Sequence, residues 1–177
     1  TSGWDLTNDR GETPSAVQSS TGDQYAYFKD INSTSFYVET EITVSKDLGD
    51  SFPKFGLAAR VGDNTLFFYI DGSSNYNAQR VGYVSRNDKG EWAWGTNDNK
   101  EQQVDIGKYT DGEYVKLGML RDGNTFKLYV NDQLIFTVTD VRGFGSDKAS
   151  VAAVLTFTTG VTIRNYSATT DIASVEK

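Results

Sequence analysis

Two glutamates, Glu39 and Glu41, have the spacing in this sequence that best suits carboxylate chemistry. On a β-strand, residues two apart point to the same face, and their Cα atoms lie about 6.5–7 Å from one another. Paired carboxylates at such a spacing could hydrolyse a glycosidic bond, one as general acid and the other as base or nucleophile. They could also bind sugar hydroxyls, or they could lie in ion pairs on a solvated surface.

Three further residues are predicted to share the face of these glutamates. By strand parity, Arg60 lies on it, and so do Tyr69 and Asp71 on the following strand. The Arg60 guanidinium could pair with a glutamate, which contributes little at an exposed site. It could instead offer a planar fork of donors to vicinal hydroxyls or a carboxylate. The small residues Gly56 and Ala58 beside them predict a shallow polar basin on one sheet.

Trp92 and Trp94 alternate on a short predicted strand, so both face one way. They either fill the core or form a platform, because an indole ring stacks on a flat ligand while its N–H finds a polar partner. The polar segments on both sides of this strand favour partial exposure. The candidate ligand-binding residues are therefore Glu39, Glu41, Arg60, Tyr69, Asp71, Trp92 and Trp94.

The composition excludes several kinds of site. The 177 residues include no histidine and no cysteine, which removes histidine-based triads, histidine metal ligands, thiolates and disulfides. The net charge is −7 and the basic residues are scattered, which argues against nucleic acid as a partner. No apolar run approaches about 20 residues, so we expect no membrane insertion.

The segment from Val115 to Val138 predicts a three-strand antiparallel meander. Apolar residues alternate along three runs, and the turn sequences Arg-Asp-Gly-Asn and Asn-Asp separate them. The same pattern of alternating apolar runs separated by turn residues covers nearly the whole chain, and no stretch of twelve residues shows a helical period. The sequence thus predicts an all-β sandwich or barrel. The expected strands are 25–29, 35–45, 54–61, 65–71, 80–86, 91–94, 113–120, 125–130, 133–139, 150–157 and 161–168.

Parity on the best-defined strands also predicts the core. The residues expected to face inward are Phe36, Val38, Thr40, Ile42 and Val44, then Phe55, Leu57, Ala59 and Val61, then Leu66, Phe68 and Ile70. The length suits one domain. We expect this domain to span residues 1–170 and residues 171–177 to begin a linker, with the polar segment 1–21 irregular apart from an early short strand.

Three segments resemble the concanavalin A-like lectin and glucanase superfamily, whose jelly-roll sandwich of two antiparallel sheets also occurs in laminin G-like domains. They are FYVETEITV with FGLAARVGDNTLFFYID, the meander VKLGMLRDGNTFKLYVNDQLIFTV, and AAVLTFTTGVTIRNYSA. In size and texture the chain is similar to carbohydrate-binding modules of secreted bacterial glycoside hydrolases, such as fructan-binding modules. The resemblance implies a secreted or cell-surface module, tethered to other modules, that binds an oligosaccharide or polysaccharide.

The resemblance also bears on catalysis. Jelly-roll glucanases carry three alternating carboxylates on one strand, and here the third is missing after Glu41. We therefore expect a non-catalytic module. The alternatives are an adhesin or laminin G-like module that binds a host protein, and an active glycosidase. Relatives often hold a structural calcium ion, for which the sequence offers hard oxygen ligands. The acidic candidates are Asp5, Asp9, Asp23, Asp30, Asp140 and Asp147.

Overall fold

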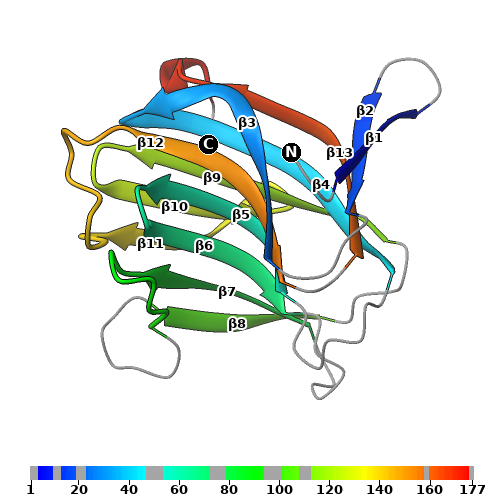
Figure 1. Ribbon diagram of the computed structural model, residues 1–177, viewed down its shortest axis with the longest axis horizontal. Coiled ribbons are helices and arrows are strands. Elements are labelled where there is room, and N and C mark those ends of the chain that lie inside the picture. The colour runs from blue at the N-terminus through cyan, green and yellow to red at the C-terminus, as the bar shows by residue number, and fades with distance from the viewer. Residues whose placement is uncertain are drawn as a thin grey trace.

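The structure is a computed structural model that describes residues 4–9, 13–18, 23–46, 54–71, 79–93, 101–107, 113–157 and 160–175. Its strands form two antiparallel sheets (Figure 1). The seven-stranded sheet has the order β1 (Trp4–Asp9), β2 (Thr13–Gln18), β13 (Gly160–Thr169), β4 (Ser35–Lys46), β9 (Val115–Asp122), β10 (Thr125–Val130) and β11 (Gln133–Thr139). The six-stranded sheet has the order β3 (Asp23–Ser33), β12 (Ser150–Phe157), β5 (Lys54–Val61), β6 (Asn64–Asp71), β7 (Gln79–Arg86) and β8 (Glu101–Gly107).

The predicted meander is confirmed as β9, β10 and β11. Its first turn places Gly123 at a φ of 62°, in the left-handed region that glycine adopts without strain. Its second turn places Asn131 and Asp132 at φ values of 48° and 67°. Two central residues in the left-handed region match the strand twist of a two-residue hairpin, and asparagine and aspartate tolerate that region.

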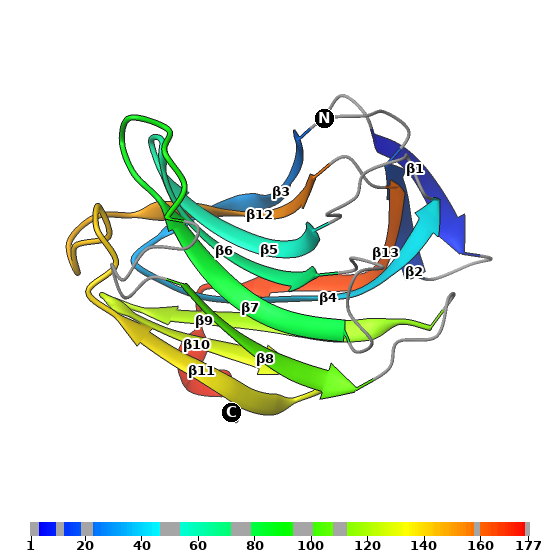
Figure 2. The ribbon, with the colours of Figure 1, turned by 90° about the horizontal axis from the view of Figure 1, so that it is seen from below.

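The two sheets stack face to face around one apolar core, as the sequence predicted (Figure 2). The strands β5, β6 and β7 are bowed, and the outer face of the six-stranded sheet lies on the inner side of the bow. The predicted inward-facing residues are confirmed in this core, with Val61 packed at its margin and the Val44 side chain outside the description. Those confirmed as buried are Phe36, Val38, Thr40, Ile42, Phe55, Leu57, Ala59, Leu66, Phe68 and Ile70.

Three strand predictions differ from the structure. β8 was missed, because its sequence Glu-Gln-Gln-Val-Asp-Ile-Gly contains only two alternating apolar residues. The segment 1–21, predicted as irregular apart from one early short strand, forms two strands, β1 and β2. The predicted strand 91–94 is wrong in the part that is described, since only Trp92 pairs, in an isolated bridge with Arg86. Trp94 lies outside the described residues.

The most consequential error concerns which strands share a sheet. β4 belongs to the seven-stranded sheet and β5 and β6 to the six-stranded sheet. Glu39 and Glu41 therefore do not share a face with Arg60, Tyr69 and Asp71, and the predicted common basin is wrong. The prediction assumed that consecutive strands pair, which holds for roughly two-thirds of them. Here β4 pairs instead with β9 and β13, which follow it much later in the chain.

The C-terminal segment packs against the sandwich. Ile172 in the short 3₁₀ helix η1 (Ile172–Ser174) and Val175 after it contact a cluster on the outer face of the seven-stranded sheet. That cluster consists of Tyr37, Leu120 and Tyr129. Two apolar side chains beyond residue 171 are therefore partly buried against the sandwich, and the linker expected there stays a prediction. Nowhere among the described residues is there a helix with the length and apolarity needed to cross a membrane.

Candidate ligand-binding site

Strand register arranges the outer face of the six-stranded sheet in rows of side chains. Residues directly opposite one another in an antiparallel ladder point to the same face. Read from β3 or β12 toward β7, the rows are Val151, Arg60, Thr65 and Arg86; then Tyr27, Ala153, Ala58, Phe67 and Val84; then Tyr25, Leu155, Gly56, Tyr69 and Gly82; then Phe157, Lys54, Asp71 and Arg80. The face is thus aromatic and apolar at its centre and charged at both ends.

The centre of this face is a buried aromatic cluster. Phe67 and Tyr69 are fully buried, with ring centroids 5.4 Å apart. Trp92 packs on Phe67 at 6.0 Å and on Phe157 at 5.5 Å. Trp92 therefore reaches back over the sheet from beyond the end of β7. Of the two predicted stacking tryptophans, this one lies on the face that carries Tyr69, in an apolar cluster.

Tyr69 and Asp71 are predicted ligand contacts that the structure buries. Asp71 is 2% exposed, and its carboxylate lies 3.7 Å from the Lys54 ammonium. The same ammonium lies 5.9 Å from the centroid of the Tyr69 ring. The expected open polar basin at these positions is wrong, since buried aromatic and ion-paired side chains occupy it. Tyr69 and Asp71 instead support the groups around them.

The accessible part of the face lies where β3, β12 and β5 meet. Tyr25 and Tyr27 stack with ring centroids 5.9 Å apart and an interplanar angle of 10°. The Arg60 Nη1 donates a hydrogen bond of 2.7 Å to the Tyr27 hydroxyl, and its Cζ lies 4.5 Å from the Tyr25 centroid. Tyr27 is 49% exposed. We call these three residues, Tyr25, Tyr27 and Arg60, the tyrosine–arginine wall.

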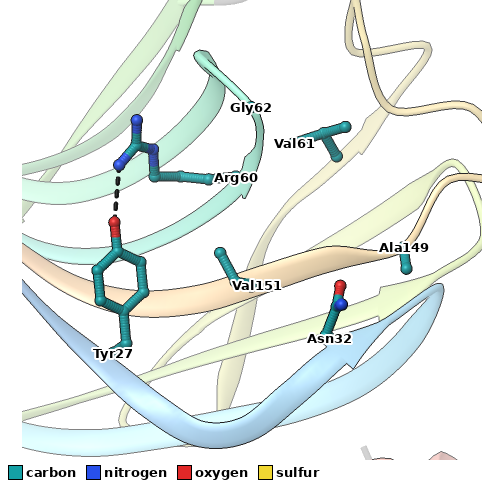
Figure 3. A pocket seen from close by; sticks show the side chains of 7 residues that line it. All are labelled: Tyr27, Asn32, Arg60, Val61, Gly62, Ala149 and Val151. Carbon is teal, nitrogen blue, oxygen red and sulfur yellow. Dashed lines mark hydrogen bonds between the residues drawn. The ribbon is translucent and has the colours of Figure 1, made fainter.

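A hollow of about 390 Å³ adjoins this wall (Figure 3). Tyr27 from β3 and Arg60 from β5 reach toward each other across β12, on which Val151 lies. The Asn32 amide supplies a further polar group to the lining. The residues around the hollow are Tyr27, Asn32, Arg60, Val61, Gly62, Ala149 and Val151. An aromatic edge, a guanidinium and an amide around one hollow suit a ligand with many hydroxyls.

Arg86 and Trp92 form a second cation–aromatic pair on the same face, with the Arg86 Cζ 5.6 Å from the Trp92 ring centroid. A tight turn holds Trp92 in place. The Asn87 side-chain oxygen accepts hydrogen bonds of 2.9 Å from the backbone N–H groups of Lys89 and Glu91. Side-chain bonding of this kind is what favours asparagine in turns.

Sequence reasoning missed Tyr25, Tyr27 and Arg86. The first two alternate on a predicted strand, and that period-2 signal could have marked them as one face. Arg86 could not be aligned with Arg60 from the sequence, because their shared row depends on the register of two hairpins.

Glu39 and Glu41 lie on the outer face of the seven-stranded sheet, where both are in ion pairs. Glu39 accepts a hydrogen bond of 2.8 Å from the Tyr37 hydroxyl and lies 3.4 Å from the Lys116 ammonium. Glu41 accepts a hydrogen bond of 3.2 Å from the Arg164 Nε. The interpretation of these glutamates as ion-paired acids is confirmed, and the predicted ion pair with Arg60 is wrong. Arg60 pairs instead with Asp63, whose carboxylate oxygen lies 3.5 Å from the Arg60 Nη2.

The buried Tyr37 phenol is expected to make the folded protein less stable at alkaline pH. Burial raises its pKa, and the hydrogen bond to Glu39 raises it further. The folded state therefore keeps the proton above pH 10, where the unfolded chain loses it, so unfolding becomes more favourable as the pH rises past about 10. We expect Tyr37→Phe to lose less stability than the wild type between pH 9 and pH 11 in urea titrations. An equal loss in both proteins would contradict this role for Tyr37.

The predicted calcium ion finds no support among the side chains that the structure describes, where no three acidic groups gather as metal ligands would. Those of Asp5, Asp9 and Asp23 lie outside that part of the chain. A structural calcium remains a prediction, and it requires the melting temperature to fall when a chelator is added. An unchanged melting temperature would contradict a stabilising ion.

No protein-family model matches this chain, and no curated protein matches it in sequence. Solved structures do match its fold. The carbohydrate-binding module CBM66 from Bacillus subtilis is 13% identical over 94% of each chain, with a TM-score of 0.57. A toad ovary galectin in complex with thio-digalactose is 11% identical, with a TM-score of 0.57, over 85% of this chain and 100% of the galectin.

A polysaccharide lyase of family 18 is 14% identical, with a TM-score of 0.56, over 94% of this chain and 93% of the lyase. Binding proteins and an enzyme thus share this architecture, so the likeness establishes the fold and leaves the activity to the site. The chain has a jelly-roll sandwich fold of two antiparallel sheets, as its sequence predicted.

Proposed function

We propose that this protein is a non-catalytic carbohydrate-binding module that holds an oligosaccharide or polysaccharide on the outer face of the six-stranded sheet. The observation that carries the proposal is the tyrosine–arginine wall beside the hollow. The half-exposed Tyr27 ring offers a flat apolar surface to a sugar ring. The Arg60 guanidinium, fixed by the Tyr27 hydroxyl and the Tyr25 ring, offers donors to sugar oxygens.

We expect weak affinity, micromolar or poorer. The wall is partly open to water, and association carries an entropic cost that a shallow contact offsets only in part. A tethered module can compensate for this, because linked modules bind at a high effective concentration. Such a role suits a module of a larger secreted or cell-surface protein, which is the setting we propose for this chain.

The distribution of carboxylates favours binding over hydrolysis. Glycoside hydrolysis generally requires two carboxyl groups about 5–9.5 Å apart. On β5, β6, β7 and β12, the side chains described on the outer face include one carboxylate, that of Asp71, and it pairs with Lys54. Asp105 on β8 lies in the same row, opposite Arg80, and its side chain is outside the description. Glu41 is paired with Arg164 on the other sheet. Hydrolysis of a neutral oligosaccharide panel that disappears in Asp71→Asn or Glu41→Gln would contradict a purely binding role.

A protein-binding adhesin would present a broad apolar patch instead. Among the residues whose side chains are described, the large exposed hydrophobic ones are Tyr27 and Leu134. They lie on different sheets, Tyr27 on β3 and Leu134 on β11. This separation favours a sugar over a protein partner.

We expect Arg60→Ala to abolish measurable binding while the fold survives. The variant loses charge-assisted hydrogen bonds to the ligand, worth about 1.5–3 kcal/mol or roughly 10- to 150-fold in affinity, and it frees the Tyr27 ring. A glycan array on the isolated domain identifies the ligand, and calorimetry measures its affinity for each variant.

The matched control is Arg164→Ala, which removes the same charge from the other sheet and leaves the tyrosine–arginine wall intact. We expect its affinity to equal that of the wild type. Unchanged affinity in Arg60→Ala would remove Arg60 from the site.

A further inference from the structure

One row on the outer face of the six-stranded sheet is basic although the whole protein is acidic. The chain carries a net charge of −7. The row of Val151, Arg60, Thr65 and Arg86 holds two basic residues and no acidic residue. The acidic residues that the ladders place on this face lie in other rows, and they are Asp23, Asp71, Glu101 and Asp105. A row of one sign of charge on a concave face attracts ligands of the opposite sign.

Both cations have donors that the described residues do not satisfy. The Nε atoms of Arg60 and Arg86 are buried and have no hydrogen-bond partner. Within the described part of the chain, the Arg86 guanidinium makes no hydrogen bond or ion pair and contacts the Trp92 ring. The Arg86 side chain is partly exposed, so its guanidinium has donors left for a ligand.

The carboxylate that does reach Arg60 leaves its guanidinium available to a ligand. Asp63 lies 3.5 Å away at the β5–β6 turn, and its side chain is 64% exposed. An ion pair at such an exposed position contributes little. A ligand carboxylate that exchanges with Asp63 therefore gives up little stabilisation.

Arg60 and Arg86 lie in one row, on either side of Thr65. Two strand spacings place their Cα atoms about 10 Å apart. Thr65 is fully buried between them, so the two long side chains form the surface at this point. Arg60 also borders the hollow, on the side of Val151. A ligand seated in the hollow and extended along this row passes over both guanidiniums.

We propose that the sugar bound here is acidic, and that a uronic acid carboxylate lies between Arg60 and Arg86. The planar fork of arginine matches the two oxygens of a carboxylate and binds it more strongly than it binds a neutral hydroxyl. This inference rests on the proposed function, since it names the substrate class of the same site.

The experiment compares each acidic oligosaccharide with its own carboxyl-reduced form. Oligogalacturonate and oligomannuronate hexamers, and the same hexamers with every carboxylate reduced to a primary alcohol, are titrated into the wild type by calorimetry. We expect at least one acidic form to bind and its reduced form to bind at least tenfold more weakly. We expect Arg86→Gln to remove this preference without lowering the melting temperature, since Arg86 makes no hydrogen bond to the described residues. Arg142→Gln is the matched control, an exposed arginine outside the face, and it keeps the preference.

The outcomes separate the inference from the proposed function. Equal binding of the acidic and reduced forms, or binding of neutral glycans alone on the array, overturns the acidic ligand and leaves the sugar-binding proposal in place. Binding of neither kind of glycan overturns both. Equally tight binding of dextran sulfate would show general attraction of polyanions and would also overturn carboxylate recognition.

Discussion

Arg121→Met is expected to destabilise the protein by about 3–5 kcal/mol, the largest effect of any single change considered for this fold. The Arg121 guanidinium is fully buried, and burial lowers its pKa. It donates to four backbone carbonyls and one hydroxyl, and no carboxylate is among those partners. The acceptors are Ser33 O at 3.1 Å, Gly123 O at 2.8 Å, Gly145 O at 3.0 Å, Lys148 O at 2.6 Å and Ser150 Oγ at 2.6 Å. Each partly buried acceptor left without a donor costs about 1 kcal/mol or more.

Urea unfolding of Arg121→Met, Arg121→Lys and the exposed control Arg142→Met measures this cost. Lysine has three donors and methionine none, so we expect Arg121→Lys to lie between the wild type and Arg121→Met. We expect Arg142→Met to unfold like the wild type. A loss of less than about 1 kcal/mol in Arg121→Met would contradict the role assigned to this network.

The Arg121 network also supports the candidate site. It fixes the backbone at Ser33 and at Lys148, next to Asn32 and Ala149 in the lining of the hollow. We therefore expect the conservative Arg121→Lys, if it stays folded, to weaken ligand binding without touching the ligand.

Gly56→Ala is expected to destabilise the protein by about 3 kcal/mol, although alanine usually stabilises a strand relative to glycine. A Cβ atom at Gly56 would lie 2.0 Å from the carbonyl oxygen of Phe68 and 2.9 Å from the Cα of Tyr69. These are backbone atoms of the neighbouring strand, and they cannot move away without disturbing the ladder between β5 and β6. Overpacking against fixed atoms typically costs 1–3 kcal/mol.

Gly118→Ala is the matched control, because it also adds a Cβ in the middle of a strand. That Cβ would lie 2.6 Å from the hydroxyl of Tyr37, the far end of a side chain that can shift. We expect Gly118→Ala to be clearly less destabilising than Gly56→Ala in the same urea titrations. The reverse order would contradict the close approach of β5 and β6 beneath Tyr69.

Much of the fold could be predicted because its signals are local. The hairpin turns at Gly123 and at Asn131–Asp132 sit between runs of strict alternation, which fixes both the strands and their inward faces. Parity placed Phe36 and Phe55 in the core correctly for the same reason. β8, with two apolar residues in seven, carried too little signal to be recognised.

The candidate site could be predicted only in part, because it depends on contacts between distant segments. Parity correctly turned Arg60 and Tyr69 away from the core, but it cannot say which strands share a sheet. The pairing of β4 with β9 and β13 places Glu41 on the other side of the molecule. The burial of Tyr69 under an aromatic cluster that includes Trp92 depends equally on tertiary contacts.

The separation of charge between the two outer faces gives each sheet a different role. On the seven-stranded sheet, Glu39 forms an ion pair with Lys116 and Glu41 with Arg164. The acids of this surface are therefore paired within the protein. On the six-stranded sheet, Arg60 and Arg86 share a row that contains no acidic residue, and the Nε atoms of both have no hydrogen-bond partner. Ligand recognition is therefore expected on the sheet that carries Arg60, and the paired carboxylates that first suggested chemistry belong to the opposite face.

The most direct test is to map the bound sugar by the amide chemical shifts of isotope-labelled protein, titrated with the oligosaccharide that binds best on the array. We predict that the largest shifts fall at the tyrosine–arginine wall and the hollow, at Tyr27, Arg60, Gly62 and Val151, and continue toward Arg86. Shifts centred instead on Glu39, Glu41 and Lys116 of the seven-stranded sheet would contradict the account.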